Sequence, residues 1–229
     1  MSSKTYPTLN FETELWAKGP RFVIGMDEVG RGAIAGPVAV GVAVIDREIH
    51  QNGNPWPEKL RDSKLLSEKA REEILESVKA WVFASAVGQT SASEIEKNGI
   101  VNSLARAGSA ALNEILSIDN LREQIAKEGA VIILDGSHNW IGPKSSGIDV
   151  VVKTKADRDC VSVAAASVIA KVMRDSQMIE LAGALPGYGF EGHKGYASSQ
   201  HIEAVRKLGP SPEHRLSWLT NILADQPEQ

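Results

Sequence analysis

The feature that most constrains this chain is a pair of adjacent carboxylates at the end of an apolar segment. The apolar residues Phe22–Ile24 predict a strand, and Asp27 and Glu28 follow it in the run GMDEVGRG. Neighbouring acids raise each other's pKa, so such a pair is costly in a protein core. A divalent cation, in contrast, takes several hard oxygen ligands. The doublet therefore predicts a metal site at the end of the first strand.

A glycine-rich turn follows the two acids directly. It contains Gly30, Arg31 and Gly32. Glycine has no Cβ, so the backbone can come close to a ligand. Acids for a metal beside bare amides and an arginine indicate a substrate that contains phosphate.

Composition narrows the class of protein. The chain has 229 residues, of which 42% are hydrophobic and 24% charged, as in a globular protein of one large or two small domains. No apolar run reaches the roughly 20 residues of a membrane helix. The first residues do not resemble a signal peptide, and Cys160 is the only cysteine, so no intrachain disulfide is expected. We expect a cytoplasmic protein with no membrane association.

The net charge of −4 argues weakly against a nucleic-acid binder, because such proteins often carry a basic surface. Acids at a metal site contribute to this total although the metal neutralises them. The placement of Lys and Arg therefore matters more than the sum.

The order of apolar patterns predicts an α/β fold. We expect residues 1–20 to be a polar lead-in with one short helix, and residues 21–229 to form a single domain. Strands are expected at 22–26, 37–45, 81–89, 130–134 and 148–154, and helices at 9–17, 67–80, 91–118 with a break at Asn98-Gly99, 162–182, 199–208 and 214–223. Residues 46–59 and 187–196 are expected to be loops. This order predicts a mixed sheet with a helical C-terminal extension from about residue 185.

Two further strands are followed by acids. Asp135 follows 130–134, and Asp157 follows 148–154. Acids at the ends of neighbouring strands converge at one edge of a sheet. Four such carboxylates repel one another unless cations lie between them, and two Mg²⁺ ions about 4 Å apart serve phosphoryl displacement in other enzymes. With no Cys or His cluster, zinc is not expected. For any single acid, a turn or a cap is the alternative role.

Six sequence blocks in this order resemble those of the bacterial type 2 ribonucleases H, the ribonuclease HII family, over about Ile24 to Trp218. The blocks are DEVGRG at 27–32, DSKLLS at 62–67, LDG at 134–136, KAD at 155–157 with AAAS at 164–167 and AKVMRD at 170–175, HKGY at 193–196, and HRLSW at 214–218. Two local departures are Ala156, where glycine is frequent, and Ala197-Ser198 in place of Gly-Thr.

The resemblance implies a ribonuclease-H-like mixed β-sheet flanked by helices. It implies that Asp27, Glu28, Asp135 and Asp157 are the catalytic, metal-binding residues and that the cofactor is Mg²⁺ or Mn²⁺, with two ions when substrate is bound. The implied reaction is hydrolysis on the 5′ side of a ribonucleotide, which leaves 3′-hydroxyl and 5′-phosphate ends. The implied substrates are RNA–DNA hybrids and single ribonucleotides embedded in duplex DNA. A monomer acting in ribonucleotide excision repair and RNA primer removal is expected.

The resemblance also implies roles in substrate binding. Gly30, Arg31 and Gly32 match the segment that senses the ribose 2′-hydroxyl, the group that distinguishes RNA from DNA. Tyr196 matches a tyrosine that stacks on the next sugar. Ser63 and Lys64 match a phosphate-contacting pair. The alternatives are a surface ion pair for Arg31, an aromatic core residue for Tyr196 and a solvated lysine at a helix turn for Lys64.

Several other polar residues have no single predicted role. Asp159 is an alternative to Asp157 as the fourth acid. The cations and histidines that either line the duplex or belong to a solvated helix face are Lys171, Arg174, Lys194, His214 and Arg215. No chemistry is predicted for His193 or His201.

Three other classes of protein are alternatives to this assignment. The first comprises two-metal enzymes with the same core, such as resolvases, transposases and ribonuclease HIII, and the last of these carries an additional N-terminal domain for which about 20 residues leave no room. The second is an aspartyl phosphatase, which needs an acid where Val29 stands. The third is a non-catalytic nucleic-acid-binding module, which would gain little from an acidic cluster.

Overall fold

A mixed six-stranded sheet forms the centre of the computed structural model, which describes residues 6–51, 53–142, 144–145 and 147–224. The strand order is β3-β2-β1-β4-β6-β5. The strands are β1 (Phe22–Val29), β2 (Val38–Asp46), β3 (Ala84–Thr90), β4 (Ala130–Asp135), β5 (Lys144–Ser145) and β6 (Ile148–Lys153). The pairs β1–β4 and β4–β6 are parallel, and the other neighbouring pairs are antiparallel.

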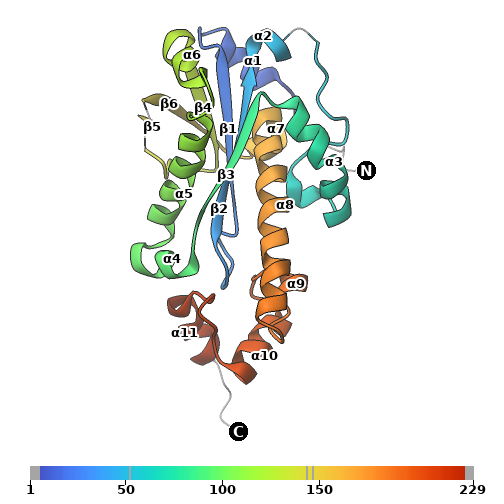
Figure 1. Ribbon diagram of the computed structural model, residues 1–229, viewed down its shortest axis with the longest axis vertical. Helices are drawn as coiled ribbons and strands as arrows, with labels where there is room; N and C mark the ends of the chain where they lie inside the picture. Colours follow the sequence, from blue (N-terminus) through green and yellow to red (C-terminus); the bar gives the residue numbers. More distant parts are fainter. Residues whose placement is uncertain (1–5, 52, 143, 146, 225–229) are drawn as a thin grey trace.

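Helices cover both faces of the sheet (Figure 1). The helices before the last strand are α1 (Asn10–Trp16), α2 (Arg47–His50), the 3₁₀ turn η1 (Ser63–Leu65), α3 (Glu68–Trp81), α4 (Ala92–Asn98), α5 (Ile100–Ile115) and α6 (Leu121–Glu128). Those after it are α7 (Ala156–Asp159), α8 (Val161–Ala184), α9 (Phe190–His193), α10 (Ser199–Leu208) and α11 (Leu216–Ala224). Helix α5 packs on β2 and β3, whereas α8 packs on β1 and β2 from the opposite side, next to α3. Helices α9, α10 and α11 lie together at one end of the molecule.

The predicted fold class is confirmed, and the starts of two predicted helices have recognisable caps. Ser67 caps α3 by accepting a hydrogen bond from the Ala70 amide, and Ser91 and Glu94 form a capping box on α4. The predicted break in the long helix occurs at Gly99, where φ is +75°. The signals at these positions are local, because each cap depends on residues within one helical turn.

Two predicted loops and one unassigned segment contain short helices. Helix α2 lies within 46–59 and α9 within 187–196, and α6 fills part of the segment between α5 and β4. Helix α6 buries only Leu121 and Ile125, which is too few apolar positions to reveal a periodicity. The lead-in is not peripheral, because Leu15 and Trp16 of α1 are buried in a cluster with residues of β1, β2 and α8. Within the described residues, every helix is too short or too polar to span a bilayer.

Close contact between α8 and the sheet fixes the positions of the side chains on α8. A Cβ at Gly25 would lie 2.3 Å from the carbonyl carbon of Ser162, and a Cβ at Gly41 would lie 2.3 Å from the carbonyl oxygen of Ala166. The helix therefore lies directly on the backbone of β1 and β2. The small residues of this helix, among them Ala164, Ala165, Ala166 and Ala170, make this approach possible.

The sheet opens at one point between β1 and β4. Their parallel pairing ends at Met26 and Leu134. Strand β1 nevertheless continues to Val29, paired with β2 alone. The residues that follow the last β1–β4 pair are Asp27 on β1 and Asp135 on β4, so the acids lie where the two strands separate.

The packing of α8 on the sheet predicts the effect of two matched glycine substitutions. Gly41→Ala should lower the free energy of unfolding by about 2 kcal/mol, because backbone must move to admit the methyl group. Gly183 lies near the end of α8, and a Cβ there would have no atom within 4 Å, so Gly183→Ala should raise that free energy slightly. Urea unfolding of the two variants measures both effects. Equal effects would contradict the close packing of α8.

Candidate active site

Four acids from three elements approach one another where the sheet opens. Asp27 and Glu28 lie on β1, Asp135 ends β4, and Asp157 lies on α7. The expectation that Asp157 follows its strand directly needs correction. Strand β6 ends at Lys153, and Lys155, with φ +61°, turns the chain into α7. Asp157 is therefore presented by the first turn of a short helix rather than by a strand end.

Asp27 is the most buried of these acids, with 2% of its surface exposed. Burial is the main cause that raises the pKa of Asp27 to about 8, and the charges of Glu28 and Asp135 contribute to the rise. The charge of Lys64 and a hydrogen bond from Ser167 act in the opposite direction. The Oδ1 atom also accepts a hydrogen bond from the Glu28 amide at 2.8 Å. Without an added cation, the Asp27 carboxyl is therefore held largely in its neutral form near pH 7.

Asp135 and Glu28 are the next two acids of the cluster. Burial raises the pKa of Asp135, and the charges of Asp157 and Glu28 raise it further. The Oδ1 atom of Asp135 accepts a hydrogen bond from the Ala156 amide at 2.7 Å, which ties β4 to α7. Glu28 Oε1 lies 3.4 Å from Arg31 Nη1, whereas its Oε2 is buried without a hydrogen-bond partner. A carboxylate oxygen that is buried among other acids without a hydrogen-bond partner is available as a ligand for a cation.

Lys64 is the cation nearest to the acids. Its Nζ lies 3.1 Å from Asp157 Oδ2. Burial lowers the pKa of Lys64, but the charges of Asp27 and Asp157 outweigh burial, so the net shift is upward. Its side chain is mostly exposed at the site, so it can turn toward a substrate. Lys64 thus supplies part of the positive charge that the acids require.

The donor set fits a divalent metal ion, although the side chains are not gathered around one point. Among the described residues, no three His, Cys, Asp or Glu side chains are grouped so as to hold a metal ion as they stand. The acids nevertheless offer only hard oxygen donors, one of which has no partner, and burial disfavours the charged forms of Asp27 and Asp135. These properties match Mg²⁺ or Mn²⁺. These side chains would have to move closer together to hold one such ion.

One cavity joins the acids to the predicted substrate-binding residues. It is lined by Asp27, Glu28, Val29, Gly30, Arg31, Gly32, Ser63, Lys64, Asp135, Ser167, Lys171 and Tyr196. Asp157 lies outside this lining and reaches it through Lys64. Asp159 instead pairs with Lys153 at 2.8 Å, so the structure favours Asp157 as the fourth acid.

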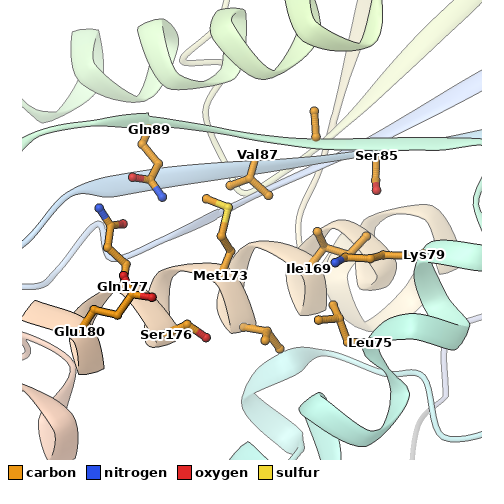
Figure 2. A pocket seen from close by; sticks show the side chains of 12 residues that line it. Leu75, Lys79, Ser85, Val87, Gln89, Ile169, Met173, Ser176, Gln177 and Glu180 are labelled. Atoms are coloured by element: carbon orange, nitrogen blue, oxygen red, sulfur yellow. The ribbon is translucent and has the colours of Figure 1, made fainter. Parts of the chain in front are cut away.

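A separate hollow lies between β3, α3 and α8 (Figure 2). Its lining is mainly apolar, with Leu75, Val87, Ile169 and Met173 among the residues that face it. The charged residues of this lining are one lysine and one glutamate, Lys79 and Glu180. This lining contains one acid and the first cavity contains three, so the first cavity is the candidate for a metal-dependent active site.

The glycine-rich turn meets Tyr196 directly. The Gly30 amide donates to the Tyr196 hydroxyl at 3.2 Å. Gly30 has φ +79°, a conformation that favours glycine, and a Cβ there would lie 2.1 Å from Arg174 Nε. Tyr196 is 37% exposed, so its ring forms part of the cavity wall rather than of the core. Arg31 pairs with Glu28, an acid of the site itself.

Two arginines prove to be buried supports of these loops, which corrects the expectation of a duplex-lining or solvated role. Arg174 donates to the carbonyls of Pro37, Lys194 and Ala35 at 2.8, 2.9 and 3.1 Å. Arg215 donates to the carbonyls of Gly30, Arg31 and Gly36, the shortest at 2.7 Å. Both side chains are fully buried.

A sequence signal existed for one of the two arginines. Ala170 and Met178, each four residues from Arg174, are buried apolar residues, so the helical period places position 174 on the inner face of α8. Lys194 is also buried, with its Nζ 3.3 Å from Glu68. Of the five cations and histidines left open, Lys171 lines the cavity.

Ser63 lies behind Asp27. Its hydroxyl is buried and hydrogen bonds to Ser167 Oγ at 2.8 Å. Arg71 holds the same turn by donating to the carbonyls of Ser63 and Leu66 at 3.0 and 2.7 Å, and it pairs with the buried Asp175. This geometry favours a supporting role for Ser63, while Lys64 projects toward the cavity.

Comparison with known proteins gives consistent matches. A family model described as Ribonuclease HII matches residues 24–221. The Ribonuclease HII of Streptomyces avermitilis is 41% identical over 93% of this chain and 83% of that protein. The Ribonuclease HII of Thermus thermophilus is 40% identical over 89% of each chain.

Solved structures show the same fold. The ribonuclease H2 of Pyrococcus horikoshii superposes with a TM-score of 0.69 at 26% identity, covering 89% of this chain and 97% of that one. Bst-RNase HIII in complex with Mn²⁺ superposes with a TM-score of 0.64 at 23% identity, covering 90% of this chain and 70% of that one. At that identity the second match shows the fold alone.

The environment of Asp27 predicts how the metal-free protein responds to pH. Burial raises the pKa of Asp27 to about 8, so the stability that this shift contributes is complete below about pH 4, the ordinary pKa of an aspartate, and is lost as the pH rises through about 8. In EDTA, Asp27→Asn should therefore be more stable than the parent protein at about pH 9, by at least about 1 kcal/mol. Urea unfolding between about pH 5 and pH 9 measures this. A variant no more stable than the parent protein at the upper end would contradict the assignment.

Proposed function

Because the chain belongs to the ribonuclease HII family, we propose that its acidic cavity hydrolyses the phosphodiester on the 5′ side of a ribonucleotide within a duplex. The chain is an endoribonuclease that cleaves RNA in RNA–DNA hybrids, as its family match over residues 24–221 shows. The proposal adds single ribonucleotides embedded in DNA as substrates, and 3′-hydroxyl and 5′-phosphate ends as products. The observation that carries it is the meeting of four acids with the Gly30–Gly32 turn and Tyr196 in and beside one cavity.

Asp27, Glu28, Asp135 and Asp157 are the residues that would hold the divalent metal used by the family. The proposal is two ions, Mg²⁺ or Mn²⁺, when the substrate is bound. When bound, such ions activate the attacking water and neutralise charge on the phosphate and on the leaving oxygen. The four carboxylates orient this chemistry because β1, β4 and α7 fix them on three sides of the opening in the sheet.

Lys64 has a second role in this proposal. While it pairs with Asp157, it balances part of the acidic charge. Once cations are present, its ammonium group is free to contact an oxygen of the scissile phosphate. An ammonium group is a suitable phosphate ligand, acting as a point charge.

The turn at Gly30–Gly32 and Tyr196 would select the ribonucleotide. Backbone donors and acceptors of the turn can serve a 2′-hydroxyl, which both donates and accepts hydrogen bonds. Tyr196 stands beside them, and its hydroxyl already accepts from the Gly30 amide. Its ring would stack on the following sugar, where a deoxyribose fits best. This arrangement favours an RNA–DNA junction over uniform DNA.

Ribonuclease HIII shares the fold but is the weaker candidate. The Bst-RNase HIII structure is 23% identical to this chain, whereas two Ribonuclease HII proteins are about 40% identical over most of their length. The proposed physiological setting is excision of embedded ribonucleotides and removal of RNA primers, by a monomer in the cytoplasm. Excision and primer removal suit the reaction and the substrate class.

The metal-site assignment predicts which acids cleavage requires. The substrate is a labelled DNA duplex with one ribonucleotide, incubated with Mg²⁺, with Mn²⁺ or with EDTA. Cutting directly 5′ to the ribonucleotide should require a metal, and Asp135→Asn and Asp157→Asn should lower the rate by about 10³-fold or more, since each removes a charged ligand. Asp159→Asn is the matched control, because Asp159 pairs with Lys153 outside the cavity. Near-normal cleavage by Asp157→Asn would defeat the assignment.

Junction recognition by Tyr196 predicts a difference between substrates. Tyr196→Ala should reduce kcat/KM on the single-ribonucleotide duplex about tenfold more than on a uniform RNA–DNA hybrid. The reason is that the first substrate places a deoxyribose directly after the ribonucleotide at the cleavage site, whereas the hybrid places another ribose there. Steady-state kinetics on both substrates measure the ratio. Equal losses on the two substrates would reject this role for the ring.

A further inference from the structure

Two buried histidines form a hydrogen-bonded chain behind Tyr196. His201 on α10 and His214 before α11 are 0% and 2% exposed. Their Nε2 atoms lie 3.0 Å apart. His201 Nδ1 lies 2.9 Å from the Tyr196 carbonyl oxygen, and His214 Nδ1 lies 2.9 Å from the Ser211 amide nitrogen. Every ring nitrogen of the pair therefore has a partner.

The partners at the two ends set the direction of the chain. The Ser211 amide can only donate, so His214 Nδ1 accepts and His214 Nε2 carries the proton. His214 Nε2 then donates to His201 Nε2, and His201 Nδ1 carries the proton that it donates to the Tyr196 carbonyl. All three hydrogen bonds can form only when both rings are neutral, because an added proton on either ring would place two N–H groups opposite each other.

The surroundings of the pair favour the neutral forms. Burial lowers the pKa of His201 to about 4 and also lowers the pKa of His214. The titratable side chains packed against the pair are those of His193, whose ring stacks on His201 at 4.1 Å, and Tyr188, whose ring lies 5.0 Å from His214. A charge on His193 would disfavour protonation of both rings further.

The chain joins the two halves of the proposed ribose-sensing surface. At one end it holds the backbone of Tyr196. At the other end His214 precedes Arg215, whose guanidinium binds the Gly30 carbonyl at 2.7 Å. The Gly30 amide also donates a hydrogen bond to the Tyr196 hydroxyl, so the same two segments are in direct contact. The ring of Tyr196 is thus attached to the glycine turn both directly and through the histidine pair.

We propose that His201 and His214 are positioning residues that set the distance between Tyr196 and the Gly30–Gly32 turn, and so set selectivity for an RNA–DNA junction. The proposal rests on the proposed function of Tyr196. The two histidines act through Tyr196 and Arg215 and do not touch the substrate. Their removal should change the choice between substrates more than the rate of cleavage itself.

The test compares four versions of the full chain on two substrates. They are the parent protein, Tyr196→Ala, His201→Leu and His201→Asn. The amide nitrogen of Asn can occupy the position of Nδ1 and keep the donor to the Tyr196 carbonyl, whereas Leu cannot donate. The readout is the ratio of kcat/KM on a single-ribonucleotide duplex to kcat/KM on a uniform hybrid. A partly unfolded preparation lowers both values equally, so a purely structural role would leave this ratio unchanged.

The expected result is a ratio that falls about tenfold in His201→Leu, as in Tyr196→Ala, and stays within about threefold of the parent value in His201→Asn. A ratio that falls in Tyr196→Ala but not in His201→Leu would overturn the positioning role and leave the proposed function standing. Equal falls in His201→Leu and His201→Asn would also overturn it, because ring packing would then matter rather than the donor. A ratio unchanged in every variant would overturn both proposals.

A second measurement needs no variant and so does not depend on folding. Nitrogen-15 NMR of the histidine rings in the parent protein near pH 7 reports which nitrogen carries the proton. The chain predicts a neutral His201 protonated on Nδ1 and a neutral His214 protonated on Nε2. The opposite tautomer on either ring, or a charged ring, would break the chain and overturn the proposal.

Discussion

Repulsion among carboxylates at the point where β1 and β4 separate is the constraint on which the site depends. Burial raises the pKa of Asp27 to about 8, and Lys64, 3.1 Å from Asp157, is the cation nearest to the group. Arg31, 3.4 Å from Glu28, is a second cation at the site, and two positive charges do not balance four acids, so protons or added cations stabilise the arrangement. The same feature that weakens the metal-free protein thus favours a divalent metal.

The proposed substrate-binding turns are largely backbone, and buried arginines hold that backbone in place. Arg174 and Arg215 donate to carbonyls around the glycine turn, and Arg71 does the same for the turn that carries Lys64. A guanidinium has several fixed donors and remains charged, so one side chain can bind two or three carbonyls. The close approach of α8 to the sheet at Gly25 and Gly41 then places Ser167 and Lys171 against the acids.

Local patterns predicted the acids, most of the longer helices and every strand except the two-residue β5, because each depends on neighbours along the chain. The supports of the site were not predicted. Arg215 and Gly30 are 185 residues apart, and nothing near Arg215 indicates that its partners are carbonyls of the glycine turn. Asp157 was placed at a strand end because the turn at Lys155, with its positive φ, has no glycine to reveal it. His201 carried no recognisable signal, since its role depends on His214 and on the carbonyl of Tyr196.

The central claim is that the acidic cluster binds a divalent metal in competition with the proton of Asp27, and Mn²⁺ binding tests it most directly. Electron paramagnetic resonance of free Mn²⁺, titrated with protein in the absence of nucleic acid, gives the affinity. The account predicts tighter binding as the pH rises toward about 8, where Asp27 ionises, and weaker binding by Glu28→Gln than by the parent protein. The same affinity in both proteins, or an affinity independent of pH, would contradict it.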